Sequence, residues 1–271
     1  MNDYDRLLDV RDLRKSFAVS TRALERQENG LLRRATAVDG VTFSVRRGET
    51  LGIVGESGCG KTTLARMIVR LIEPDSGEMH FRGHNWLGAK GEELRALRNR
   101  IQMVFQDPIA SLNARMRVGA IVGEPLAIHE PRLARSERQA RAQQMLDAVG
   151  LGADSLTRYP HEFSGGQRQR IGIARALVLR PDLVVADEPV SALDVSVGAQ
   201  ILELLDRLRR DFSLTLILIS HSLPVIAQLA TRVAVMQGGR FVEFGFADQV
   251  LQSPQHPYTQ ALIRAVPQVR S

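Results

Sequence analysis

Apolar residues recur with a strand period in some segments of the chain and with a helix period in others. Residues 7–12 and 41–45 alternate apolar and polar positions, and Arg47-Gly48 follows as a turn signal. This pattern predicts half-buried strands of an antiparallel layer near the N-terminus. Between them, residues 19–36 are polar and basic without a sustained period, so we expect a loop or excursion there.

Strand and helix patterns then alternate in the remaining chain. Residues 50–54 read as a short buried strand, and one helical face follows, made of Leu64, Met67, Ile68, Leu71 and Ile72. Further strands are expected at 183–186, 214–219 and 232–236, with a helix carrying Ile201, Leu204, Leu205 and Leu208 between the first two. Such alternation predicts a largely parallel sheet covered by helices. The turn at 237–239 predicts a hairpin-like final strand at 240–244.

A helical pattern dominates from residue 108 to about 179. Ser136 is the expected N-cap of a segment that runs to Gly150, its expected C-terminal stop. We interpret this region as a helical subdomain inserted into the sheet domain.

Composition narrows the possible functions. The 271 residues are 44% hydrophobic and carry a formal net charge of +6, which is compatible with one large globular domain and could indicate nucleic acid or anionic lipid as a partner. The arginines, however, are scattered along helical stretches, so we interpret them as solvated faces and expect no nucleic-acid partner.

The cysteine content and the hydropathy pattern indicate the cellular compartment of the chain. Cys59 is the single cysteine, which excludes an internal disulfide and a cysteine-ligated cluster built from this chain alone. The first residues lack the apolar core of a secretion signal, and no window approaches the ~18 apolar residues of a membrane helix. We therefore expect a protein of the reducing cytosol whose membrane role depends on a partner.

Residues 55–62 match the phosphate-binding pattern G-x-x-x-x-G-K-[ST] between a predicted strand and a predicted helix. Glycines allow backbone N–H groups to curl around phosphate oxygens, and the helix N-terminus adds partial positive charge. In this pattern Lys61 would reach the β- and γ-phosphates, and Thr62 would offer its hydroxyl to Mg²⁺.

An apolar strand ending in Asp187 and Glu188 predicts acids delivered to the same phosphate site. Asp187 would hold Mg²⁺, directly or through water, and Glu188 would polarise the attacking water. These two motifs alone define a phosphate-loop nucleotidase, a class that includes kinases, GTPases and helicases.

A further motif narrows the class. Phe163-Ser164-Gly165-Gly166-Gln167 places a serine cap and two glycines at a predicted helix start, which makes a second anion site without a lysine. One nucleotide does not need two such cradles in one chain. Two chains facing head to tail would use both, each giving its Ser-Gly-Gly turn to the γ-phosphate held by the other.

Ser-Gly-Gly-Gln resembles the signature of ATP-binding-cassette (ABC) ATPases, and the other family motifs appear in order over nearly the whole chain. The resemblance implies an α/β phosphate-loop NTPase fold with a RecA-like parallel-sheet core, an N-terminal antiparallel β layer and an inserted helical subdomain. It implies one ABC ATPase domain over residues 1–271, with a helical signature subdomain at 107–179 and a C-terminal tail at 246–271.

The resemblance also implies ATP and Mg²⁺ as cofactors and assigns residues by motif. Gln106 is similar to the Q-loop glutamine, His221 to the switch histidine, and residues 191–194 to the D-loop. The expected catalytic residues are Glu188, His221 and Gln106, and the expected metal-binding residues are Thr62, Gln106 and Asp187. The expected nucleotide-binding residues are Phe17 (adenine stacking), Gly55, Glu56, Ser57, Gly58, Cys59, Gly60, Lys61, Thr62, Thr63, Ser164, Gly165, Gly166, Gln167 and Asp194.

Two stretches, residues 158–163 and 256–262, resemble the ATPases of dipeptide and oligopeptide (and nickel) importers. This implies an importer ATPase on the cytoplasmic face of the cell membrane, bound to membrane-spanning permease subunits and to a second ATPase chain, and served indirectly by an extracytoplasmic solute-binding protein. Two alternatives stay open: the same machine carrying nickel or another small solute, and a soluble cassette ATPase of DNA repair or translation.

Overall fold

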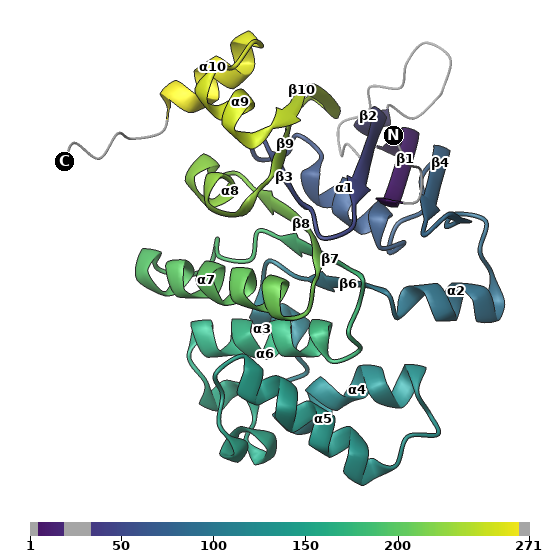
Figure 1. Ribbon diagram of the computed structural model, residues 1–271, viewed down its shortest axis with the longest axis vertical. Coiled ribbons are helices and arrows are strands. Elements are labelled where there is room, and N and C mark those ends of the chain that lie inside the picture. The colour runs from purple at the N-terminus through teal and green to yellow at the C-terminus, as the bar shows by residue number, and fades with distance from the viewer. Residues whose placement is uncertain (1–4, 19–33, 266–271) are drawn as a thin grey trace.

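A computed structural model describes residues 5–18 and 34–265 of the protein (Figure 1). Its strands are β1 (Arg6–Ala18), β2 (Arg34–Arg46), β3 (Thr50–Val54), β4 (Ser76–Phe81), β5 (His84–Asn85), β6 (Ile101–Val104), β7 (Leu183–Asp187), β8 (Thr215–Ser220), β9 (Arg232–Gln237) and β10 (Arg240–Phe246). Its α-helices are α1 (Lys61–Ile68), α2 (Gly91–Arg98), α3 (Pro108–Ser111), α4 (Val118–His129), α5 (Arg135–Ala148), α6 (Gly165–Leu177), α7 (Val195–Asp211), α8 (Leu223–Leu229), α9 (Ala247–Gln252) and α10 (Pro257–Arg264). Short 3-10 helices occupy Ala153–Thr157 and Pro160–Glu162.

The central sheet has the strand order β10-β9-β3-β8-β7-β6, parallel except for the edge strand β10. Neighbouring residues of each strand enter different apolar cores. In β8, Leu216 and Leu218 join the core with α6, α7 and α8, whereas Ile217 and Ile219 join the core with α1. Burial on both faces explains the nearly continuous apolar runs of these strands and confirms the predicted parallel sheet.

The antiparallel layer has the order β2-β1-β4-β5 and packs on the same side of the central sheet as α1. The expectation of a loop from 19 to 36 is wrong at its end, because Arg34, Ala35 and Thr36 pair with Ala18, Phe17 and Ser16 and so extend the hairpin. Residues 19–33 lie outside the described part of the chain. Backbone pairing with β1 forms a strand at residues 34–36, although the polar and basic segment that they end shows no sustained period.

Helices α3 to α6 lie between β6 and β7 and form the teal region at the bottom of Figure 1. The prediction of Ser136 as N-cap is wrong, because the N-cap of α5 is Ala134, two residues earlier, and the helix begins at Arg135. The Glu137 carboxylate accepts the Ala134 N–H at 3.3 Å, which satisfies a free donor at that position and leaves Ser136 inside the first turn. The helix ends at Ala148, and Gly150 follows with a φ of +78°, as its expected role as a stop requires.

The chain finishes with the predicted β9–β10 hairpin and with α9 and α10, which lie beside β10 (Figure 1). His256 caps α10, because its Nδ1 atom accepts the N–H of Tyr258 at 3.2 Å. Across residues 5–18 and 34–265, none of the helices combines the length and the apolar character needed to traverse a lipid bilayer.

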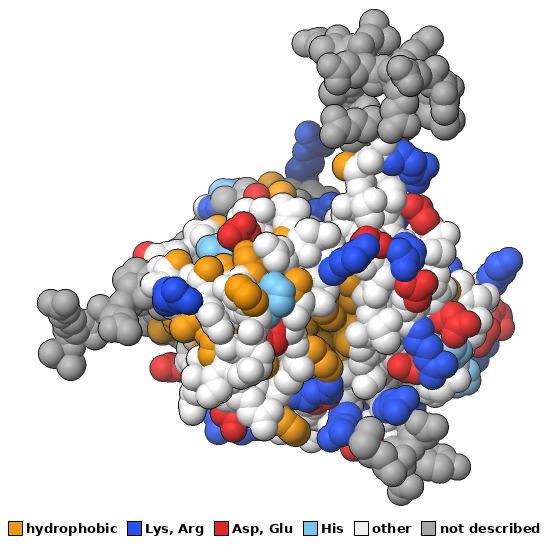
Figure 2. All heavy atoms as spheres, turned by 90° about the horizontal axis from the view of Figure 1, so that it is seen from above, with side chains coloured by type: hydrophobic (Ala, Val, Ile, Leu, Met, Phe, Trp, Pro, Cys, Tyr) orange, Lys and Arg blue, Asp and Glu red, His pale blue; other side chains and the backbone are white. Residues whose placement is uncertain are grey.

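Opposite charges are interspersed on the surface. Asp39 pairs with both Arg14 and Arg240, and Asp75 pairs with both Lys15 and Arg34. In the view from above, blue and red side chains likewise lie next to one another (Figure 2). Basic and acidic side chains are therefore interspersed on this face.

Candidate functional site

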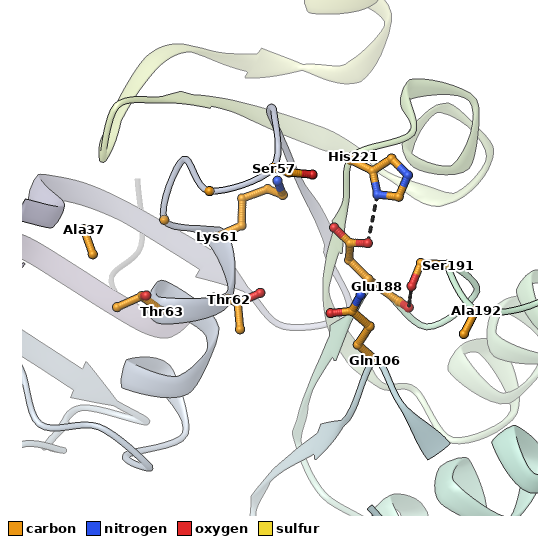
Figure 3. Close-up of a pocket in the computed structure, with 12 residues that line it drawn as sticks. Ala37, Ser57, Lys61, Thr62, Thr63, Gln106, Glu188, Ser191, Ala192 and His221 are labelled. Atoms are coloured by element: carbon orange, nitrogen blue, oxygen red, sulfur yellow. Dashed lines mark hydrogen bonds and ion pairs between the residues drawn. The ribbon is translucent and has the colours of Figure 1, made fainter. Parts of the chain in front are cut away.

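A cavity of about 560 Å³ opens where β3, β6, β7 and β8 end (Figure 3). It is lined by Ala37, Ser57, Gly58, Gly60, Lys61, Thr62, Thr63, Gln106, Glu188, Ser191, Ala192 and His221. The carboxyl ends of parallel strands meet at one edge of a sheet, so residues far apart in sequence converge there. The structure thus brings together much of the phosphate loop with Gln106, Glu188 and His221.

The phosphate loop connects β3 to α1 and approaches β2 closely. Gly60 has a φ of +111°, and a Cβ atom there would lie 2.1 Å from the carbonyl oxygen of Ala37. Both the conformation and the space therefore require glycine at this position. The loop can pass against the strand and still direct its following N–H groups into the cavity.

Lys61 begins α1, is 5% exposed, and folds back on the loop. Its Nζ atom donates to the carbonyl oxygens of Gly55 at 2.7 Å and Glu56 at 2.9 Å. The ammonium group is thereby kept at the cavity with its charge partly satisfied. It can exchange these carbonyls for phosphate oxygens of higher charge.

Asp187 ends β7 with 2% exposure, and its Oδ1 atom accepts the Thr62 hydroxyl at 3.2 Å. Burial raises the pKa of Asp187, and the Glu188 charge adds to the effect, while the hydrogen bond from Thr62 opposes it. The oxygen atoms available to a metal here are the Thr62 hydroxyl and the Asp187 carboxylate. The exposed Gln106 lines the phosphate-loop cavity together with Thr62 and a neighbouring cavity together with Asp187. Oxygen donors suit Mg²⁺, which is commonly held by one or two carboxylates together with substrate phosphates.

No cluster of three or more His, Cys, Asp or Glu residues able to hold a metal occurs in the described ranges 5–18 and 34–265. Thr62 and Asp187 could offer two oxygen ligands, and an ion bound there would take its other ligands from a phosphate and water.

Glu188 follows Asp187 with a φ of +47°, and its Oε2 atom lies 2.8 Å from Nδ1 of His221. Its N–H donates to the carbonyl of Ile219 at 2.9 Å, so the end of β8 fixes its backbone. With the carboxylate ionised, Nδ1 carries the hydrogen and donates it. A left-handed conformation at a non-glycine residue costs free energy, and here it directs the carboxylate into the cavity (Figure 3).

Gln106 lies just after β6 and lines two cavities. One is the cavity of the phosphate loop, and the other has a volume of about 880 Å³ and lies between the sheet domain and helices α4 and α6. Leu71 and Ile128 line this second cavity and are 59% and 51% exposed. Gln106 therefore borders both cavities.

The Ser-Gly-Gly segment starts α6 as its sequence predicts. The Ser164 hydroxyl oxygen accepts the Gln167 N–H at 3.3 Å, and the Gln167 side chain accepts the Ser164 N–H at 3.0 Å. Gly166 faces α7, where a Cβ atom would lie 2.4 Å from Val197. Residues 164–167 do not line the phosphate-loop cavity of their own chain.

Other predicted site residues do not line this cavity, among them Asp194, Phe17 and Cys59. Asp194 caps α7 by accepting the Val197 N–H at 2.9 Å, and this bond, followed by one from Ser196, lowers the pKa of its carboxyl group. Phe17 is 41% exposed on β1, with the Lys15 ammonium 5.6 Å from its ring centroid. Cys59 lies in the loop with its thiol half-buried; burial raises the pKa of that thiol.

Comparison with known proteins identifies the family. Residues 38–191 match the sequence model described as ABC transporter, which is more than half of the chain, and residues 242–271 match the one described as oligopeptide/dipeptide transporter, C-terminal region. The chain belongs to the ABC transporter family.

Several similar proteins in this family are peptide transporter components by name. The chain is 54% identical to the oligopeptide transport ATP-binding protein OppF of Escherichia coli, over 85% of this chain and 69% of that protein. It is 48% identical to the oligopeptide transport ATP-binding protein AppF of Bacillus subtilis, over 97% of this chain and 79% of AppF. It is 51% identical to the dipeptide transport ATP-binding protein DppF of Haemophilus influenzae, over 86% of this chain and 71% of DppF.

Solved structures of ABC proteins share the fold. A dimeric post-hydrolysis structure of the cassette MJ0796 bound to ADP and Pi superposes with a TM-score of 0.76 at 26% identity, covering 89% of this chain and 98% of that one. The cbiO1 protein of Clostridium perfringens gives the same TM-score and identity, covering 92% of each chain. These similarities confirm the predicted α/β cassette fold.

The sequence interpretation missed Ala37 and Tyr258 at this ABC site. Ala37 lines the cavity from β2, and the Tyr258 hydroxyl lies 3.0 Å from the backbone nitrogen of Glu56. Neither residue belongs to a pattern that indicates nucleotide binding. Their proximity to the loop is produced by tertiary packing alone.

Proposed function

We propose that this chain binds and hydrolyses ATP to drive the uptake of peptides across the cytoplasmic membrane. The observation that carries the proposal is the cavity that Lys61 and Glu188 share, in which a phosphate-binding cation faces a carboxylate held by His221 (Figure 3). The similar proteins named as dipeptide and oligopeptide transport ATPases support peptides as the cargo.

In the proposed reaction, the loop N–H groups and Lys61 bind and orient the phosphates of ATP. Glu188 orients and polarises the water that attacks the γ-phosphorus, and His221 holds the Glu188 carboxylate in place through Nδ1. Thr62 and Asp187, with Gln106, would hold Mg²⁺, which supplies positive charge to the phosphate oxygens when bound. The remaining proposed nucleotide contacts are Gly55, Glu56, Ser57, Gly58, Cys59, Gly60, Thr63 and, at the adenine, Phe17.

We further propose that two ATPase chains complete each site. The segment Ser164-Gly165-Gly166-Gln167 lies off the phosphate-loop cavity of its own chain and has its N–H groups at the start of α6, where an anion is favoured. In a head-to-tail pair this segment would reach the γ-phosphate of the facing chain, with Asp194 at the interface. The second chain is either an identical copy or a sister ATPase.

Membrane-spanning permease subunits are the proposed second partner. The large cavity between the sheet domain and α4 has exposed apolar residues on its rim and shares Gln106 with the nucleotide cavity. A permease segment seated there would place the chain on the cytoplasmic face of the membrane. An extracytoplasmic solute-binding protein would deliver the cargo without touching this chain.

The corresponding division of the chain is also a proposal. Residues 107–179 act as the helical signature subdomain and residues 246–271 as the tail characteristic of oligopeptide transporters, within one ABC ATPase domain over 1–271. A nickel or other small-solute cargo is the alternative for the same machine.

Copurification followed by transport tests the proposed function. The tagged chain is isolated from membranes, its bound subunits are identified, and the complex is reconstituted in vesicles with its solute-binding protein. We expect a dipeptide or oligopeptide to stimulate ATP turnover, and the Lys61→Ala complex to lose both ATP binding and uptake. Stimulation by nickel and not by peptide would replace the cargo, and a chain that copurifies with no membrane subunit would contradict the importer role.

A further inference from the structure

We propose that Tyr258 on α10 is a positioning residue for the nucleotide site, holding the start of the phosphate loop through the backbone N–H of Glu56. The phenolic oxygen of Tyr258 accepts this N–H at 3.0 Å. The contact joins the C-terminal segment to the loop across 202 positions of sequence. This inference rests on the proposed role of the loop in binding ATP.

The position of α10 is itself fixed from the central sheet. Glu243 on β10 accepts the N–H groups of Gln255 at 2.8 Å and His256 at 3.1 Å, directly before the helix. Partial burial acts to raise the pKa of Glu243, but hydrogen bonds and charge from the α10 segment outweigh it and lower that pKa. The carboxylate therefore remains an ionised acceptor, and charge-assisted hydrogen bonds of this kind are strong.

On the other side of the contact, Glu56 is held at both ends of its backbone. Its carbonyl oxygen accepts Lys61 Nζ at 2.9 Å and the Cys59 N–H at 3.3 Å, while its N–H donates to Tyr258. When Lys61 turns to a phosphate, the first of these bonds is lost. The Tyr258 bond is on the opposite side of the residue and does not have to break.

The β9–β10 turn braces the same loop at a second point, since the Gly239 N–H donates to the Cys59 carbonyl at 3.0 Å. The loop is thus attached to the C-terminal part of the chain near its beginning and near its middle. A phosphate cradle binds tightly only when its N–H groups are already directed at the ligand. Tyr258 lowers the cost of binding by holding the first turn of the cradle before ATP arrives.

Burial raises the pKa of Tyr258, so the phenol stays neutral at physiological pH and retains both acceptor and donor capacity. Replacement by phenylalanine removes the oxygen and keeps the ring, which separates the hydrogen bond from the packing of α10. Tyr159→Phe is the matched control, because Tyr159 is also half-buried, stacks on His161 and does not line the cavity.

The test measures Mg-ATP and Mg-ADP binding to the full chain by calorimetry, and KM and kcat in the reconstituted complex. For Tyr258→Phe we expect Kd and KM to rise about two- to tenfold, the effect of one net hydrogen bond. The kcat value should change by less than about twofold, because Glu188, His221 and Gln106 are untouched. Tyr159→Phe should leave all three unchanged.

Glu243→Gln gives an independent variant that leaves the phenol in place. Glu243→Gln should also raise the Kd for nucleotide. The Kd of the double variant Glu243→Gln/Tyr258→Phe should not exceed the higher Kd of the two single variants, because both substitutions act through the Tyr258–Glu56 hydrogen bond. Wild-type affinity in Tyr258→Phe would overturn the proposal, and so would full additivity of the two substitutions. A wild-type chain that binds no nucleotide would instead contradict the proposed function.

Discussion

Asp187 keeps a carboxyl group where solvent scarcely reaches it. Its pKa is raised by burial, and the Thr62 hydroxyl is the one side-chain hydrogen bond found for it in the described structure. A buried charge with so little compensation costs stability, and proteins retain such groups where a ligand later supplies the missing charge. This arrangement supports the proposed role of Asp187 as a ligand of Mg²⁺.

Asp187→Asn should therefore stabilise the chain at neutral pH in the absence of nucleotide, while abolishing Mg-dependent ATP turnover. The folded pKa lies above the unfolded value, so wild-type stability falls as pH rises from the ordinary aspartate range through the raised pKa. Asparagine removes this loss. The free energy of unfolding of Asp187→Asn in urea should exceed that of the wild type by the full amount above the raised pKa, and the difference should shrink towards zero as pH falls below it. A difference that does not depend on pH would show that ionisation of Asp187 is not its cause.

Side chains in contiguous motifs could be predicted at this scale, whereas isolated ones could not. The phosphate loop requires glycine and lysine at fixed spacing for reasons of backbone space and charge, so Gly60 and Lys61 are recognisable in sequence. Tyr258 is recognisable only after α10 has been placed against the loop. Ala37 lines the cavity only because β2 passes close to the loop, and this position does not require a particular residue type that the sequence would show.

At the scale of elements, α6 begins with a reciprocal cap between Ser164 and Gln167. The cap satisfies two N–H groups that the helix itself cannot pair. In the same turn, Gly166 lies directly against Val197 at the start of α7.

Ser164→Ala should lower the free energy of unfolding by about 1 kcal/mol, the usual effect of removing a side-chain N-cap. Ser164→Asp is the matched control, because aspartate caps helices as well as serine does, and its stability should be close to wild type. Chemical denaturation of the three proteins checks this. Equal losses in both variants would mean that the hydroxyl contributes through something other than capping.

Long or strongly patterned elements were predictable, and short ones were not. The helix α7 shows a clear helical period over 17 residues, and the strands at 50–54 and 183–187 are mostly apolar runs that end directly at the phosphate loop and at the acidic pair. Strand β6 has four residues and α8 has seven with Pro224 near its start, too few to display a period in sequence. These elements owe their form to pairing with β7 and packing on β3 and β8.

At the scale of the whole molecule, Gln106 connects two cavities. We expect Gln106→Ala to keep Mg-ATP affinity within about twofold while lowering peptide-stimulated turnover by about tenfold or more, because in the proposed complex this side chain connects the nucleotide cavity to the permease docking cavity. Binding, basal turnover and stimulated turnover in the reconstituted complex are compared.

Gln102→Ala is the matched control for this coupling, since Gln102 lines the second cavity but not the first. It should retain stimulation. If both variants lose stimulation equally, docking at the cavity and not Gln106 is responsible; if Gln106→Ala loses only ATP affinity, the coupling role is wrong.

In the proposed pair of chains, residues 164–166, which lie off the phosphate-loop cavity of their own chain, complete the site of the facing chain. If Glu188 polarises the water and residues 164–166 of a facing chain close the site, Glu188→Gln should bind ATP normally and reduce turnover by about a hundredfold or more. ATP would then remain between the chains, so the variant should form a closed pair with Mg-ATP that separates when Mg²⁺ is chelated. Light scattering of the isolated chain detects a pair of identical chains, and crosslinking within the membrane complex detects a pair with a sister ATPase.

Adding Ser164→Arg should abolish closure in either setting, because a large side chain would occupy the place of the γ-phosphate while leaving the first chain's cavity intact. Turnover at the wild-type rate in Glu188→Gln, or closure that persists with Ser164→Arg, would contradict the shared site.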